Sequence, residues 1–123
     1  MDDVLLFFNT RPEVLPLYKA IEKVICGEFE DTRIKVQKTQ ISFYNKHLFA
    51  CASLPIRKVK GWPKVCLLFT LGLNRKLEHP RVAYVTEPYP GRWTHHILIQ
   101  KEKDIDAELI EWIREAYVFA LVK

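Results

Sequence analysis

Residues 87–96 bring together side chains that can bind an anion or transfer a proton. They include the Glu87 carboxylate, the Arg92 guanidinium, the Trp93 indole and the His96 imidazole. An arginine can bind a carboxylate or a phosphate through two parallel hydrogen bonds. We therefore predict that Arg92, Trp93 and His96 rim a site for an anionic or polar ligand. The structural alternative pairs Glu87 with Arg92 and uses Trp93 to close the edge of a sheet.

A second set of polar side chains alternates along the first predicted strand. Residues two apart on a strand point to the same face, which here carries Lys38, Gln40, Ser42 and Tyr44. These groups offer hydrogen-bond donors and an aromatic ring. We predict that Lys38, Gln40 and Tyr44 form the floor of the ligand site, with His96 on the same face. The alternative is an ordinary solvated sheet face.

Two adjacent histidines are candidate metal ligands that strand geometry separates. Neighbouring residues on a strand point to opposite faces, so His95 and His96 cannot readily hold one ion together. His95 should face the core, because Ile97 and Ile99 lie two and four residues further along the same strand and point to the same face. A metal site would need His79, His47, Glu87 or a cysteine to converge on one of them, and no ligand spacing indicates this. No cofactor is therefore expected, and a hydrogen-bonded structural histidine is the simpler interpretation.

The densest basic run of the chain suggests a second class of partner. Arg57, Lys58 and Lys60 precede Trp62, and such a group can bind phosphates while the indole stacks on a base. Nucleic-acid binding is therefore an alternative function. The simpler account is a basic loop that keeps the end of a sheet soluble. The sequence has neither an RNP-type aromatic pattern nor a KH-type GxxG motif.

Familiar catalytic motifs are absent from the sequence. It contains no GxSxG, HExxH or GxGxxG pattern, and its four glycines leave little room for a phosphate loop. This favours a binding module over an enzyme. The remaining alternative is a small enzyme or metal-binding protein centred on His96, with Glu87 or His79 beside it. Cys66, on an apolar strand, is expected to be a buried small hydrophobe.

The charges of the chain are segregated along the sequence. Residues 32–103 hold fourteen lysines and arginines against three glutamates, whereas residues 1–31 carry a net charge of −4 and the last twenty −3. A positive central region flanked by acidic ends can attract an anion or a nucleic acid.

Composition indicates one globular domain over residues 1–123, since 49% of the residues are hydrophobic and 28% charged. The apolar runs are shorter than the roughly twenty residues of a membrane span. The acidic N-terminus is unlike a secretory signal, and three cysteines without CxxC spacing suggest free thiols. We therefore expect a cytoplasmic protein with no membrane contact.

Local patterns predict the elements that must position these residues. A helix is expected to begin at a capping box formed by Thr10 and Glu13 and to end near Gly27. Pro16 predicts either a distorted first turn or a helix that begins nearer Pro12 than Thr10. Four strands are expected, over residues 33–44, 47–54, 64–73 and 94–100. The first changes phase, which predicts a bulge near Lys38.

The remaining segments complete the predicted order. Asn45-Lys46 is a hairpin turn, and residues 74–93 are a long connection with a short helical turn near Pro80. A final helix, opened by Asp104, carries apolar residues at helical spacing. The fold class is therefore α+β: a single antiparallel β-sheet with N-terminal and C-terminal helices packed on one face. An exposed edge strand would permit a homodimer.

Three stretches of the chain resemble a small bacterial domain-of-unknown-function family. They are Arg11-Pro12-Glu13 with Leu17-Tyr18, residues 38–44, and residues 87–96. Relatives in this family are sometimes labelled as predicted transport proteins. The chain is also distantly similar to frataxin-like and YjbR-like α+β domains. The resemblance implies helices packed on one antiparallel sheet, and it transfers no catalytic residue.

Overall fold

The computed structural model describes residues 3–55, 61–63 and 65–122. Its helices are α1 (Asp3–Phe7), α2 (Leu15–Glu28) and α3 (Ala107–Val122), with 3-10 turns at Pro12–Val14 and Glu102–Asp104. Its strands are β1 (Arg33–Val36), β2 (Ile41–Tyr44), β3 (Leu48–Ser53), β4 (Leu67–Leu73), β5 (Val82–Tyr89) and β6 (Arg92–Ile99).

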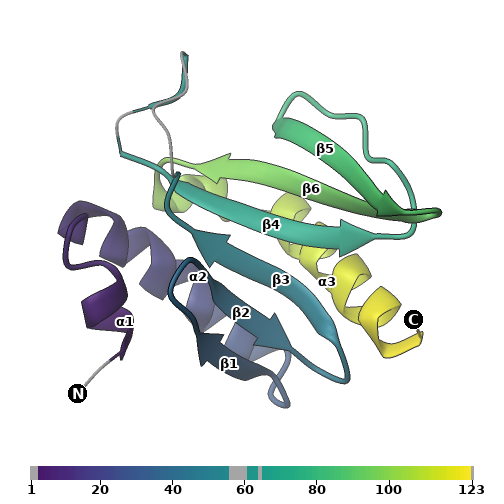
Figure 1. Ribbon diagram of the computed structural model, residues 1–123, viewed down its shortest axis with the longest axis horizontal. Coiled ribbons are helices and arrows are strands. Elements are labelled where there is room, and N and C mark those ends of the chain that lie inside the picture. Colours follow the sequence, from purple (N-terminus) through teal and green to yellow (C-terminus); the bar gives the residue numbers. More distant parts are fainter. Residues whose placement is uncertain (1–2, 56–60, 64, 123) are drawn as a thin grey trace.

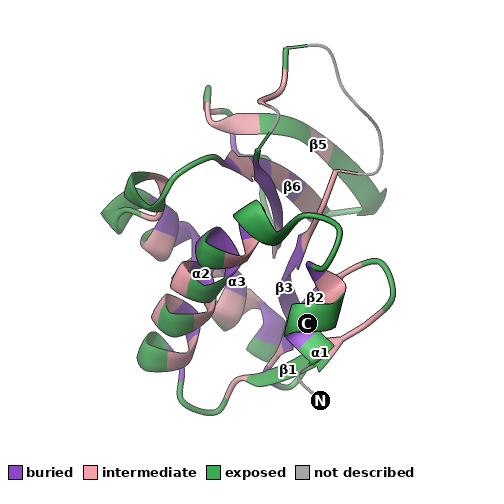
Figure 2. Ribbon diagram, turned by 90° about the vertical axis from the view of Figure 1, so that its left-hand side faces the viewer, coloured by how far each residue is buried: buried purple, intermediate pink, exposed green. Residues whose placement is uncertain are grey.

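The six strands form one antiparallel sheet in the order β1-β2-β3-β4-β6-β5 (Figure 1). Helices α2 and α3 lie on the same side of this sheet (Figure 2). The predicted α+β class is confirmed. No helix in the described part of the chain has the length and apolar character that crossing a membrane requires.

The start of α2 differs from the capping box predicted at Thr10 and Glu13. The chain first makes a 3-10 turn, and no side-chain hydrogen bond caps that turn or α2. Pro16 is one of the first two residues of α2, where a missing amide costs nothing because that amide would be unpaired anyway. The helix ends one residue after Gly27.

The expected first strand is in fact a hairpin of β1 and β2. Between them the Gln37 N–H donates to the Gln40 carbonyl oxygen at 2.8 Å. The change of phase in the sequence therefore marks a turn, and the predicted bulge near Lys38 is wrong. The irregularity in register lies instead at Phe43 and Tyr44, where β2 meets β3 after the Asn45 turn.

The predicted connection over residues 74–93 contains the edge strand β5, and the expected helical turn near Pro80 is wrong. Most residues of β5 are exposed, as Figure 2 shows by its largely green ribbon. Because β5 is an edge strand, it tolerates Pro88 and lacks the alternation of apolar residues that marks a half-buried strand.

Helix α3 buries the apolar stripe that the sequence indicated, including Leu109, Ile113 and Ala116. Its N-terminal cap is Asp106, since the Asp106 carboxylate accepts the Leu109 N–H at 3.0 Å. The predicted cap, Asp104, instead accepts backbone N–H groups just before the helix, at 2.9 and 3.2 Å. Carboxylate oxygens thus accept backbone N–H groups both before the 3-10 turn at Glu102–Asp104 and at the start of α3.

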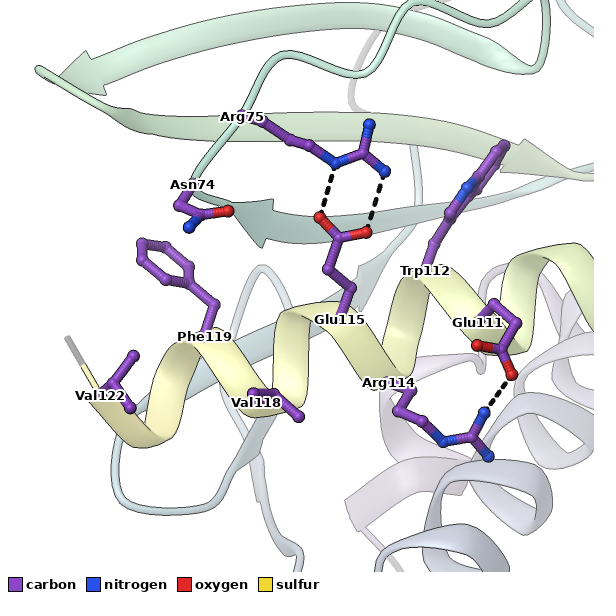
Figure 3. Close-up of a pocket in the computed structure, with 9 residues that line it drawn as sticks. All are labelled: Asn74, Arg75, Glu111, Trp112, Arg114, Glu115, Val118, Phe119 and Val122. Carbon is purple, nitrogen blue, oxygen red and sulfur yellow. Dashed lines mark hydrogen bonds and ion pairs between the residues drawn. The ribbon is translucent and has the colours of Figure 1, made fainter.

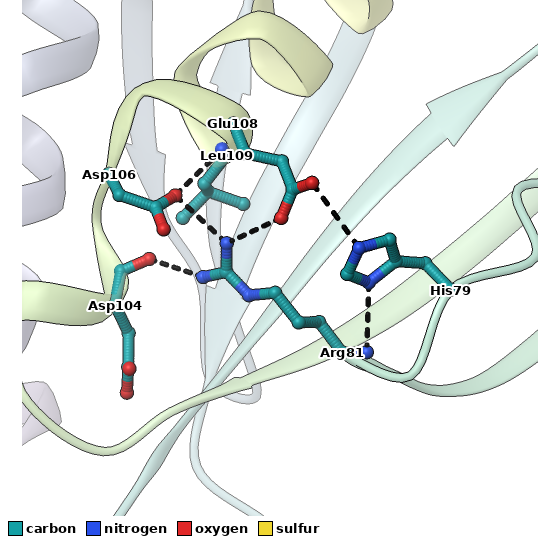
Figure 4. A network of polar contacts seen from close by, with 6 residues as sticks. All are labelled: His79, Arg81, Asp104, Asp106, Glu108 and Leu109. Atoms are coloured by element: carbon teal, nitrogen blue, oxygen red, sulfur yellow. Dashed lines mark hydrogen bonds and ion pairs between the residues drawn. The ribbon is translucent and has the colours of Figure 1, made fainter.

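A polar network holds the start of α3 against the segment that leads into β5 (Figure 4). Arg81 donates to the Asp106 carboxylate at 2.8 Å, to Glu108 at 3.3 Å and to the Asp104 carbonyl oxygen. His79 lies 3.2 Å from a Glu108 carboxylate oxygen. These contacts use acidic side chains of the C-terminal region to bind basic groups of the central region.

The parity prediction for the two histidines is confirmed. His95 is fully buried on the core side, and its Nε2 accepts the Leu77 N–H at 2.8 Å. This bond requires an unprotonated Nε2. Burial lowers the pKa of His95 from its ordinary value of 6.5.

We predict that acid destabilises the protein through His95. The unfolded chain takes up a proton near pH 6.5 while the buried ring resists it, so stability is full above that pH. As the pH falls below 6.5, stability declines by at most about 1.4 kcal/mol per pH unit for this group. Urea unfolding of the wild type and of His95→Gln at pH 7.5 and 5.5 measures the effect. A substitution that leaves the pH dependence unchanged would contradict the assignment, and His47→Gln is the control.

Candidate functional site

The strand pairings place five side chains in one row across the sheet. The partners run from Ser42 to Cys51, Thr70, His96 and Tyr84, each on a different strand. The sequence neighbours of Ser42, Cys51 and Thr70 belong to the core under α2 and α3, so this row lies on the opposite side. We call that side the outer face.

The centre of the row carries no charge at neutral pH. The Thr70 hydroxyl lies 2.9 Å from His96 Nδ1, and Cys51 is the direct partner of Thr70 on β3. Burial lowers the pKa of His96 and raises the pKa of the Cys51 thiol. These groups are therefore suited to hydrogen bonding, and an ion pair of thiolate and imidazolium is disfavoured.

Three aromatic rings gather at the β5 end of the row. The Tyr84 ring stacks on His96 with centroids 4.0 Å apart, and Trp62 lies 6.3 Å from Tyr84 in a nearly parallel plane. Tyr84 remains 44% exposed. A cross-strand pair thus shields the imidazole while keeping one aromatic ring accessible.

A small hollow opens on the outer face next to this row. It has a volume of about 110 Å³ and is lined in part by Leu48, Cys51, Thr70, Gly72 and Thr94. Gly72 and Thr94 are direct partners across β4 and β6. Because Gly72 has no side chain, the hollow lies over the backbone of a central strand.

The described strands carry more basic than acidic side chains. Within the six described strands the charged residues are Arg33, Lys35, Glu87 and Arg92. The three cations alternate onto the outer face: Arg33 pairs with Tyr44, Lys35 with Ser42 and Arg92 with Tyr89. None of them forms an ion pair with another described residue. The Glu87 carboxylate accepts the Gly91 N–H at 3.1 Å.

A larger hollow, of about 570 Å³, lies on the helix side along α3 (Figure 3). Its charged groups already have partners. Arg75 makes two hydrogen bonds to the Glu115 carboxylate, at 2.7 and 2.9 Å, and Arg114 pairs with Glu111 and with Glu28. An anionic ligand would have to displace these carboxylates, whereas the outer face presents cations without such partners.

The residues predicted to form the site's floor are spread along the sheet. Lys38 lies in the β1–β2 turn, and the Gln40 amide donates to Ser42 at 2.8 Å just before β2 begins. Tyr44 ends β2 near the hollow, since it pairs with Leu48. Strands β3 and β4 separate β2 from β6, which places this floor roughly 14 Å from the His96 strand.

The residues predicted as the rim divide between the two faces. Arg92 and His96 belong to the outer face, with the Arg92 guanidinium carbon 5.8 Å from the Tyr89 ring centroid. Trp93 pairs with Leu73, a core residue, and Lys76 lies 5.8 Å from its ring centroid. Alternation therefore puts Trp93 on the side opposite His96. Tyr44, Arg92 and His96 share the outer face with the hollow and neighbour residues that line it: Tyr44 pairs with Leu48, His96 pairs with Thr70, and Arg92 precedes Thr94 by two residues.

The alternative sites are placed only in part. Arg57, Lys58 and Lys60 lie outside the described residues, whereas Trp62 belongs to the aromatic stack. Among the residues that the structure places, no group of three or more His, Cys, Asp or Glu side chains could hold a metal ion. His79 contacts Trp112 and Glu108 on the helix side, away from His96.

Sequence reasoning missed Cys51, Thr70, Gly72, Tyr84 and Thr94. One signal was available: Thr70 and Gly72 interrupt the apolar run of β4 at alternate positions. In a strand whose other positions are nearly all buried, two such residues mark the side that the helices leave uncovered.

We predict that Tyr84→Ala raises the pKa of His96 toward its ordinary value of 6.5. The stacked Tyr84 ring excludes water from the imidazole, and hydration favours the protonated form. An NMR titration of the His96 ring protons measures the change. Tyr89→Ala, at the far end of β5, should leave the His96 pKa unaltered. An unchanged value in Tyr84→Ala would show that other groups bury the ring.

Comparison with known proteins identifies a family for this chain but assigns it no activity. Neither a curated protein nor a solved structure shows significant similarity to the chain. A family model described as "Domain of unknown function (DUF5655)" matches residues 6–120, which include all the strands, the whole of α2 and most of α3. The chain therefore belongs to the DUF5655 domain family.

Proposed function

We propose that the chain is a non-enzymatic binding module for a small anionic or polar ligand held on the outer face of the sheet. The observation that carries this proposal is a hollow with two threonine hydroxyls, those of Thr70 and Thr94, in a mainly apolar lining. It lies on the side of the sheet that also presents Arg33, Lys35 and Arg92. Acidic side chains on the helix side have basic partners there, as Glu115 has Arg75. An approaching anion is thus favoured at the outer face.

The size of the hollow limits what it can enclose. Pockets that enclose a drug-sized ligand commonly have volumes of about 300–1,000 Å³. A hollow of about 110 Å³ can take a single group, such as a carboxylate or a phosphate. The rest of a ligand would lie on the open sheet against Tyr44 or Tyr84.

The chemistry of the row favours binding over catalysis. A nucleophilic thiol or a general base works best with a pKa near neutrality. Burial moves Cys51 and His96 away from the charged forms, and the Thr70 hydroxyl lies between their strands. These groups can donate and accept hydrogen bonds without transferring a proton.

We predict that inorganic phosphate shifts the backbone amide signals of Thr70, Gly72 and Thr94 in NMR spectra at constant ionic strength. Arg92→Gln should weaken this binding by about fivefold, since two opposite unit charges about 4 Å apart in water attract each other by about 1 kcal/mol. Lys23→Gln, which removes the same charge from the exposed surface of α2, is the control. Equal affinities for both variants would contradict the role of Arg92.

Nucleic-acid binding is a second candidate, favoured by the stack of Trp62 on Tyr84. A base stacked on an aromatic side chain contributes about 1–3 kcal/mol. Tyr84→Ala should therefore weaken binding of a labelled single-stranded oligonucleotide at least fivefold in an anisotropy titration, with Tyr89→Ala as control. Binding should also fall steeply between 50 and 200 mM salt. Absence of binding at low salt, or indifference to salt, would end this candidate.

A further inference from the structure

Gly72 occupies a position where the fold does not require glycine. The described glycines with positive φ are Gly61 and Gly91, so the backbone of Gly72 is one that other residues adopt. A Cβ atom built on Gly72 would meet no heavy atom within 4 Å. Neither backbone strain nor close packing therefore explains the missing side chain.

A glycine at position 72 is expected to lower the stability of the folded protein. Gly72 lies in β4, which has β3 on one side and β6 on the other. Glycine inside a strand loses more conformational freedom on folding than other residues and packs nothing against its neighbours. A glycine at such a position is often a place where a ligand or another backbone comes close.

The surroundings of Gly72 indicate what could come close. Thr94 is its direct partner on β6, and no described residue hydrogen-bonds to the Thr94 hydroxyl. Arg92 is two residues before Thr94 on the same face, about 7 Å along the strand. Thr70 and Cys51 line the other side of the hollow, and Leu48 gives it an apolar wall.

We propose that Gly72 keeps open a subsite for an oxyanion, a carboxylate or a phosphate group, which the Thr94 hydroxyl and the Arg92 guanidinium bind. The inference rests on the proposed function and names the place and the chemical class of the ligand. The Thr94 hydroxyl donates to the anion, and Arg92 supplies the opposite charge in the form that best binds planar or tetrahedral oxyanions. Leu48 contacts the carbon next to a bound carboxylate.

The test replaces Gly72 with alanine and with valine, because a Cβ atom at this position meets open space and a larger side chain would occupy more of the hollow. Both variants should keep the fold and raise the melting temperature by about 2–5 °C, since each removes an unfavourable strand glycine. Both should also weaken binding of inorganic phosphate and of acetate at least tenfold in amide-shift titrations. Gly27→Ala is the matched control, because its Cβ in α2 also meets open space.

The outcomes separate the subsite from the wider function. Higher stability with lost anion binding supports the inference, and preferential binding of one probe tells phosphate from carboxylate. If the Gly72 variants bind both anions as the wild type does, the subsite is overturned and the outer face keeps its proposed function. If they melt at a lower temperature than the wild type, Gly72 is structural and the inference fails. If the wild type shows no shifts with either probe, the proposed function fails as well.

Discussion

The alternation of side chains along β4 and β6 is the constraint on which both faces of this molecule depend. Helices α2 and α3 cover one side of the sheet, so every second residue of β4 from Leu67 to Leu73 must be apolar. The intervening positions then point to the outer face, where Thr70 and Gly72 lie. A slip of one residue in the register would exchange the two sets and expose the core. The candidate site is thus held in place by the same pairing that builds the core.

The distribution of charge follows from the same arrangement. Acidic side chains of α3 and of the segment before it bind Arg75 and Arg81, which lie outside the strands. These ion pairs bind basic side chains of the central region on the helix side of the sheet. The basic side chains of the strands remain on the outer face, without acidic partners among the residues that the structure describes. Surface ion pairs contribute little to stability, with a median near 0–1 kcal/mol. Their larger effect here is to separate the electrostatic character of the two faces.

Burial determines the chemistry of the row across the outer face. The Tyr84 ring stacks on His96, and burial disfavours the charged forms of the imidazole and of the Cys51 thiol. The row therefore adds no negative charge to the outer face. Under the proposed function, Arg92 would supply the charge that attracts an anion, and the hollow beside Gly72 would select for its shape.

The sequence by itself determined what depends on short-range periodicity. Helical spacing identified the buried stripe of α3, and strand alternation placed His95 inside and His96 outside. The sequence also showed that the apolar residues switch from one alternating set of positions to the other before Gln40. A turn and a bulge both produce such a switch. The edge strand β5 escaped detection because most of its residues are exposed and show no apolar alternation.

Only the tertiary structure decided which polar residues meet. Thr70 and His96 are 26 residues apart and contact each other because β4 pairs with β6 rather than with β5, its successor in sequence. The same strand order moved Lys38 and Gln40 away from the rim, and alternation turned Trp93 toward the core side. Strand order and register are chosen by the burial of whole faces, a property of the assembled sheet that no local pattern contains.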